Sequence, residues 1–266
     1  MGSRVVAAVP FCAPRPTPIP GSNLGVMTDT APTSRPAPCL PSPRGVDVLW
    51  SSLAGLGGML VGGLLGVLPG LWLEDLDLVL LALPAAVIGS AAGLWLGLMR
   101  RGWGWAELGF VSSRRSPWHL CWQVPVAMMA VYSCSRMFAA AAGWVWVATD
   151  TTSGGALTLA MTVTPWLLVL VSLCVVVLLP AAEEVIFRRV LLGWLLTRMP
   201  QAVAVVVAAT LFAAIHLVSI AAVYLFFLAV AASMLYLWHR SLWAPLALHA
   251  ANNALVLTLV ALASNG

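Results

Sequence analysis

Residues 166–196 read WLLVLVSLCVVVLLPAAEEVIFRRVLLGWLL and hold two adjacent acidic residues, Glu183 and Glu184, inside an apolar run. No other acidic residue follows Asp150. An acidic side chain at the centre of a membrane helix costs about 2.5–3.5 kcal/mol on insertion scales. Arg188 follows Glu184 by four residues, so on a helix it can reach that carboxylate. The cluster predicts a functional site, and a structural ion pair between helices is the alternative.

The remaining chain has the composition of a membrane protein. It is 61% hydrophobic and 8% charged, with a mean hydropathy of +0.98. Apolar runs of about 20 residues are long enough for transmembrane helices. The sequence therefore predicts an all-α fold, a polytopic transmembrane helical bundle of about seven spans. The expected spans are about 47–73, 76–99, 119–147, 158–181, 201–220, 221–239 and 242–263.

Three regions are expected along the chain. Residues 1–45 contain ten of the 18 prolines and have no apolar h-region, so they predict a disordered tail and not a signal peptide. Met27 lies inside this tail as a second candidate start. N-terminal transmembrane helices are expected over 46–154, and a membrane domain containing the glutamates over 155–263.

Arginine placement predicts the orientation in a cell membrane. All 13 basic residues are arginine, and most precede the first span, follow the second and fourth, or precede the last. Acidic residues such as Asp75 and Asp150 occupy the alternate loops. The positive-inside rule then places the N-terminus in the cytoplasm and the C-terminus outside. No basic patch with interleaved aromatic residues is present, so no nucleic-acid partner is expected.

Glycines recur every four residues in the first two spans, at Gly58, Gly62, Gly66 and Gly70 and at Gly89, Gly93 and Gly97. Such stripes predict faces on which helices pack closely. They would also permit a homodimer.

Two further polar pairs lie on apolar segments. Phe212 and His216 form F-x-x-x-H, and His249 and Asn253 form H-x-x-x-N. The i, i+4 spacing places each pair on one helix face. Because lipid surrounds the bundle, these polar groups are expected to face one another and the glutamates.

The depth of the motifs predicts an irregular helix. Pro180 is expected to kink the chain before a separate helix over 183–198. Seven simple spans would place His216 nearer the outer side than Glu183. A kinked or re-entrant 183–198 helix would relieve this mismatch, since irregular backbone is tolerated where it lines a wet cavity.

The three motifs together, E-E-x-x-x-R, F-x-x-x-H and H-x-x-x-N, resemble those of the CPBP family. This is the Abi family of CAAX-processing and bacteriocin-processing intramembrane endopeptidases, whose best-known members are the type II CAAX prenyl endopeptidases. The resemblance covers roughly residues 155–260. One departure is Arg189, where a small residue such as Gly is expected.

The resemblance implies peptide-bond hydrolysis within the membrane on a membrane-associated protein or peptide substrate. It implies that Glu183 is the general base, helped by His216. Glu184 and Arg188 are expected to orient the base.

The H-x-x-x-N motif is implied to stabilise the oxyanion, through the imidazole of His249 and the amide of Asn253. No cofactor is expected. The predicted catalytic residues are therefore Glu183, Glu184, Arg188, His216, His249 and Asn253.

Three alternatives remain. His216, His249 and a glutamate could form a zinc site, although H-E-x-x-H is absent. Carboxylates and imidazoles also make the proton relays of transporters, although the motif helices lack a clear internal repeat. The third is a non-catalytic membrane protein serving immunity or scaffolding.

Overall fold

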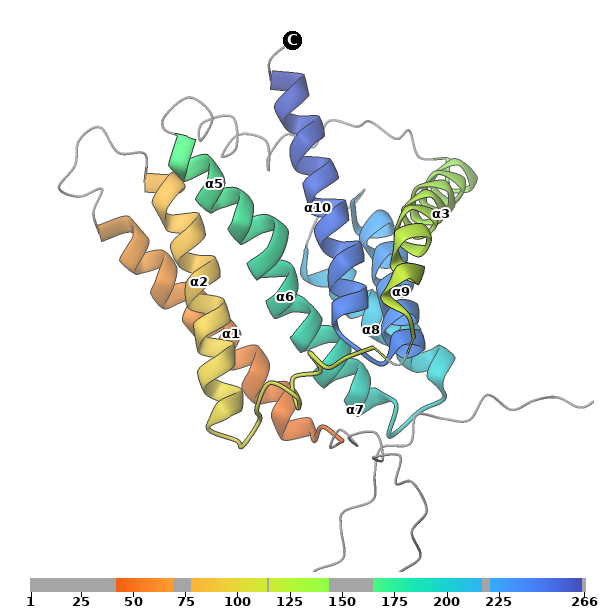
Figure 1. Ribbon diagram of the computed structural model, residues 1–266, viewed down its shortest axis with the longest axis horizontal. Coiled ribbons are helices and arrows are strands. Elements are labelled where there is room, and N and C mark those ends of the chain that lie inside the picture. The colour runs from red at the N-terminus through yellow and green to blue at the C-terminus, as the bar shows by residue number, and fades with distance from the viewer. Residues whose placement is uncertain (1–41, 69–77, 114, 144–164, 217–220, 265–266) are drawn as a thin grey trace, which may run out of the picture.

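The computed structural model describes residues 42–68, 78–113, 115–143, 165–216 and 221–264. Within these ranges every regular element is a helix (Figure 1). The elements are α1 (Gly45–Val67), α2 (Leu78–Met99), the short η2 (Pro117–His119), α3 (Leu120–Ala141), α5 (Pro165–Leu173), η3 (Cys174–Leu178), α6 (Leu179–Glu184), η4 (Val185–Leu192), α7 (Gly193–Leu195), α8 (Gln201–Ile215), α9 (Ala221–His239) and α10 (Trp243–Ser264).

The predicted polytopic helical bundle is confirmed. Six helices of the described chain are long and apolar enough to cross a membrane. A seventh apolar helix, α8, has 15 residues, so it is about 22 Å long, shorter than the ~30 Å hydrocarbon core. The protein is therefore a multi-pass membrane protein, and α8 is a short helix that ends at His216. The predicted tail lies outside the described residues up to residue 41.

The helix continues through Pro180, and this corrects the separate helix predicted over 183–198. The segments α5, η3, α6, η4 and α7 follow one another along a single ribbon (Figure 1) and give a candidate span over Trp166–Leu195. The reason is a π-helical turn just before the proline. Leu179 N–H donates to the carbonyl of Cys174, five residues back. This wider turn accommodates Pro180, whose ring would clash with a carbonyl in an α-helical turn.

This continuous helix also removes the depth mismatch that the sequence suggested. Glu183 lies well inside the span and not at its end. No re-entrant segment is then needed to bring it to the level of His216, because α8 starts at the same end of the bundle and is short.

The predicted glycine faces are confirmed as the contact between α1 and α2, except for Gly70, which lies outside the described residues. A Cβ atom placed on Gly58 would lie 2.0 Å from the carbonyl oxygen of Gly89, and one on Gly62 would lie 2.1 Å from that of Ala85. The two backbones therefore touch, and only glycine fits. Since the stripes are covered within one chain, they lend no support to the predicted homodimer, which stays a prediction.

Arginines hold the loop after α2 against the end of the bundle where α1 begins. Arg101 Nε lies 2.7 Å from Asp47 Oδ1, in the first turn of α1. Arg189 Nε donates to the carbonyl of Glu107 at 2.6 Å. The arginine-rich loops therefore meet at one end, and α10 runs from this end toward the C-terminus at the other (Figure 1).

Arg189 is the residue that departs from the family pattern. Its side chain is fully buried, and its guanidinium carbon lies 4.8 Å from the ring centroid of Trp103. Gly109 faces the same side chain with a φ of +94°, and a Cβ there would come within 3.2 Å of Arg189 Cδ. The large residue thus anchors the loop after α2 and leaves the motif residues in place.

Candidate active site

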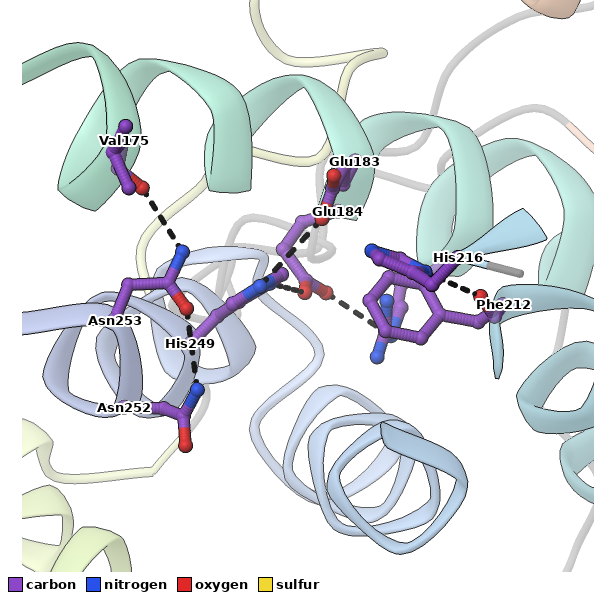
Figure 2. A network of polar contacts seen from close by, with 9 residues as sticks. Val175, Glu183, Glu184, Phe212, His216, His249, Asn252 and Asn253 are labelled. Atoms are coloured by element: carbon purple, nitrogen blue, oxygen red, sulfur yellow. Dashed lines mark hydrogen bonds and ion pairs between the residues drawn. The ribbon is translucent and has the colours of Figure 1, made fainter. Parts of the chain in front are cut away.

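The structure brings the three motifs together between the long helix (Trp166–Leu195), α8 and α10 (Figure 2). α6 supplies both glutamates, η4 supplies the motif arginine, and the other two segments supply one imidazole each. Hydrogen bonds, ion pairs or ring contacts connect five of the six predicted residues, and His216 is joined to the others through Phe212. The connected residues are Glu183, Glu184, Arg188, His216 and His249, with Phe212 among them.

Glu184 is the fixed carboxylate of the pair. Its side chain is fully buried, and its Oε1 accepts a hydrogen bond from His249 Nδ1 at 2.9 Å. Its Oε2 lies 3.1 Å from Arg188 Nε, but the two groups are not aligned for a hydrogen bond, so this contact is an ion pair. The i, i+4 spacing read from the sequence therefore does bring Arg188 onto Glu184.

Glu183 is the more accessible carboxylate, with a side chain 16% exposed. Its Oε2 lies 3.5 Å from His249 Nε2, so the imidazole stands between the two glutamates. A carboxylate can only accept, so His249 Nδ1 carries the proton given to Glu184. The contact of His249 Nε2 with Glu183 is longer than a hydrogen bond, so it is the looser of the two contacts that the ring makes with the glutamates.

His216 caps the end of α8 and has a defined tautomer. Its Nδ1 lies 2.8 Å from the carbonyl oxygen of Phe212. A carbonyl accepts, so Nδ1 carries the proton and Nε2 keeps its lone pair. The ring is half-buried. The backbone at the end of α8 thus presents an imidazole that can take up a proton at Nε2.

Phe212 packs at the centre of the site. It is buried, and its ring centroid lies 4.7 Å from the guanidinium carbon of Arg188, 4.8 Å from the ring of His216 and 5.8 Å from that of His249. A cation above an aromatic face is attracted by the ring quadrupole. This motif residue therefore holds the three nitrogen-bearing side chains against an apolar surface.

Asn253 points toward a different partner from the carboxylates. Its Nδ2 donates to the carbonyl oxygen of Val175 in η3 at 2.9 Å (Figure 2). Its Oδ1 accepts from Asn252 Nδ2 at 3.2 Å, and Asn252 Oδ1 accepts from the hydroxyl of Tyr224 at 2.5 Å. Sequence reasoning missed Tyr224 and Asn252. Both are polar residues in apolar helices, but a single tyrosine in such a helix gives only a weak signal.

The arrangement was also tested as a metal site. Both histidines direct Nδ1 at an oxygen and leave Nε2 for a ligand, as metal-binding histidines commonly do. Among the described residues, however, no three His, Cys, Asp or Glu side chains are placed to hold one ion. The donors suit zinc in kind, but they are not assembled around a common point.

The fold and the site define a multi-pass helical membrane protein with paired carboxylates and imidazoles buried between its helices. Residues 165–255 match the family model described as Type II CAAX prenyl endopeptidase Rce1-like. Over these residues the match supports the resemblance read from the motifs, to CAAX-type intramembrane proteases. All six predicted site residues lie in the matched range. Neither the curated proteins nor the solved structures give a match to the chain.

Proposed function

We propose that the protein is an intramembrane endopeptidase in which Glu183 activates the attacking water as general base. The accessibility of the two carboxylates carries this proposal. Glu184 is buried and bound to Arg188 and His249, whereas Glu183 is partly exposed and has only a loose contact at 3.5 Å. A general base must reach the water whose proton it removes, and Glu183 is the carboxylate that meets this condition.

The imidazoles have complementary proposed roles. His216, with its free Nε2, assists Glu183 in removing the proton from water. The carboxylate of Glu184 stabilises the imidazolium form of His249. In that form Nε2–H is a donor for the oxyanion of the tetrahedral intermediate. Glu183 passes the proton that it takes from water to the nitrogen of the leaving amine, so both groups end the cycle as they began it.

The proposed substrate is a membrane-associated protein or peptide.

The arginine-rich end of the bundle is placed in the cytoplasm by the positive-inside rule, and the C-terminus outside. Reporter fusions after Arg101 and after Arg240 should report the cytoplasm, and a C-terminal fusion should report the outside. A cytoplasmic C-terminus would show that α8 does not cross the membrane as a full span.

The central experiment compares cells that express the wild-type protein with cells that express Glu183→Gln. Protein N-termini in their membranes are identified by mass spectrometry. Cleavage products should be present with the wild type and missing with the variant, while both proteins reach the membrane in equal amounts. Purified protein is then assayed on an internally quenched farnesylated CAAX peptide. Identical sets of N-termini and equal peptide cleavage would end the proposal.

Zinc-dependent hydrolysis by the same residues is the second candidate, favoured by the Nε2 atoms of both histidines, which lie opposite the Nδ1 atoms held by oxygens. The ion would take His216, His249 and Glu183 as ligands and acidify its bound water. Our proposal is hydrolysis without a tightly bound metal. Elemental analysis of active protein, together with prolonged chelation, separates the two. Near-stoichiometric zinc, with activity lost on chelation and restored only by metal, would establish the second candidate.

A further inference from the structure

A fully buried histidine joins three segments at the arginine-rich end of the bundle. His239 is the last residue of α9, and both of its ring nitrogens have partners. Ser113 Oγ, from the loop before η2, lies 2.8 Å from Nδ1. Gln123 Oε1, from α3, lies 2.8 Å from Nε2. The loop, α3 and α9 are therefore held together at this point.

Three aromatic side chains form a contiguous group beside this junction. The ring of His119 meets that of Trp238 edge-on, with 5.1 Å between centroids, and that of Trp122 at 6.2 Å. Trp238 directly precedes His239 and Trp122 directly precedes Gln123, so the buried histidine fixes the positions of both tryptophans. Both indole rings are exposed on the surface of the protein.

The aromatic group carries nitrogen donors that no described residue accepts from. The guanidinium carbon of Arg115 lies 5.3 Å from the ring centroid of Trp238, and no carboxylate of the described residues pairs with it. Trp122 Nε1–H donates to His119 Nδ1 at 3.3 Å, so the neutral imidazole carries its proton on Nε2. Both side chains can therefore donate to a ligand that has anionic oxygens.

Toward the centre of the membrane, the two tryptophans continue into an exposed apolar strip. Val126 follows Trp122 by four residues on α3, and Met234 precedes Trp238 by four residues on α9, so each pair shares a helix face. The two helices pack side by side (Figure 1), and all four side chains are exposed. Because tryptophan rings favour the interface of the bilayer, the rest of the strip faces acyl chains.

We propose that this surface binds one anionic phospholipid. The lipid phosphate accepts hydrogen bonds from Arg115 and His119, and an acyl chain lies along the apolar strip. The charge of the donors is complementary to a phosphate, and charge-assisted hydrogen bonds are the stronger kind. Anionic lipids present such phosphates at the membrane surface, where a soluble phosphate would leave the strip uncovered. The inference goes beyond the proposed peptidase activity and does not depend on it.

The test is native mass spectrometry of full-length protein in detergent with added dioleoyl phosphatidylglycerol. The wild type should bind one such lipid at least about fivefold more tightly than dioleoyl phosphatidylcholine, whose headgroup has no net charge. Arg115→Gln should weaken the binding of phosphatidylglycerol about fivefold, since one basic residue at an anionic surface contributes about this factor. Adding His119→Gln should bring the loss to about tenfold or more.

Arg198→Gln is the matched control. Arg198 is exposed at the same end of the bundle, and its guanidinium carbon lies 4.4 Å from the ring centroid of Trp194. This tryptophan meets no other aromatic ring among the residues that the structure describes. The control removes the same charge from a place without the histidine and the second tryptophan, so the affinity should change less than about twofold. Both variants should unfold at the wild-type midpoint, because both arginines are exposed.

Two outcomes concerning charge and headgroup would overturn the inference. Equal weakening by Arg115→Gln and Arg198→Gln would show that the lipid responds only to the overall charge of this end. Glycerol phosphate in about tenfold excess should leave the lipid bound, because it lacks the acyl chains that cover the strip. Displacement by glycerol phosphate would instead show a site for soluble phosphate.

The same spectra also test a second copy of the chain as the occupant. A dimer has twice the mass of the single chain, so it is seen directly beside the lipid adduct. A dimer that carries no lipid and is lost in Arg115→Gln would assign the surface to self-association and overturn the inference.

Discussion

Helices α1 and α2 meet with almost no side chain between them, whereas the helices around the site are joined by side chains. In the first region the Cβ of a residue replacing Gly58 would lie 2.0 Å from the carbonyl of Gly89. In the second, His249 bonds to Glu184 and Asn253 bonds to Val175 across helices. Lipid gives helices little hydrophobic reason to associate, so close packing and polar bonds are the two available means.

The difference teaches which kind of change each region should resist. The α1–α2 contact depends on volume, and any added atom must push the backbones apart. The site depends on atom type and protonation, and a change that keeps shape can still remove its function. Each region can therefore be broken by a substitution that the other would tolerate.

The largest effect is expected from Glu183→Gln. The shape is kept and the general base is lost, so kcat should fall at least about a hundredfold, measured on the quenched peptide. The unfolding midpoint should change little, because Glu183 makes only one loose contact.

Glu184→Gln is the matched control at the neighbouring position. It should reduce kcat less than Glu183→Gln and lower the unfolding midpoint more, since it leaves the buried guanidinium of Arg188 without its counter-charge. The reverse order would show that the two glutamates have exchanged roles.

The next effect is expected from Gly58→Ala, which tests packing alone. The new methyl group meets the carbonyl of Gly89, so the helices must separate, with a loss of stability of about 1–3 kcal/mol. Gly57→Ala is the control, because no atom lies within 4 Å of its Cβ position. Unfolding midpoints in detergent decide the matter. If the two variants unfold alike, the close contact between α1 and α2 is not what stabilises the pair.

A smaller effect on turnover is expected from Phe212→Leu. The apolar volume is nearly kept, but the aromatic face under Arg188 is lost, along with its contacts to both imidazoles. We expect kcat to fall about tenfold and KM to stay within about threefold. A change confined to KM would instead place this side chain in substrate binding.

The smallest effect is expected from deleting residues 1–26. A Pro-rich polar stretch has little apolar surface to bury, so membrane insertion and activity should match those of the full chain. Asp47→Asn, just after the predicted tail, is the contrasting change. It removes the carboxylate that holds Arg101 and should lower the unfolding midpoint. Loss of insertion on the deletion would contradict the predicted tail.

Much of the architecture was predictable because a helix that crosses lipid needs about 20 apolar residues, and such runs are visible in the sequence. The helices and the glycine contact were read directly from the sequence, and the i, i+4 spacing placed Arg188 on Glu184. The error at Pro180 has a physical origin. A proline breaks an α-helix but is accommodated after a π turn, and nothing in the composition of residues 174–178 distinguishes the two.

The residues that form the site could be predicted, but the contacts among them could be predicted less well. The motifs named the residues that meet, because polar groups avoid lipid. They did not show that His249 stands between both glutamates, since that depends on how α10 faces the long helix. Tyr224 was passed over because one tyrosine in an apolar helix resembles ordinary packing.

The π turn at η3 also fixes the angular phase of the long helix. An α-helix advances about 100° per residue, so one residue more or less in this turn would rotate everything that follows by that angle. Deleting a single valine from 175–177 would turn Glu183 and Glu184 away from His249 and toward a neighbouring sector of the bundle. The direction in which the two carboxylates point thus depends on the number of residues in η3, although no residue of η3 contacts them.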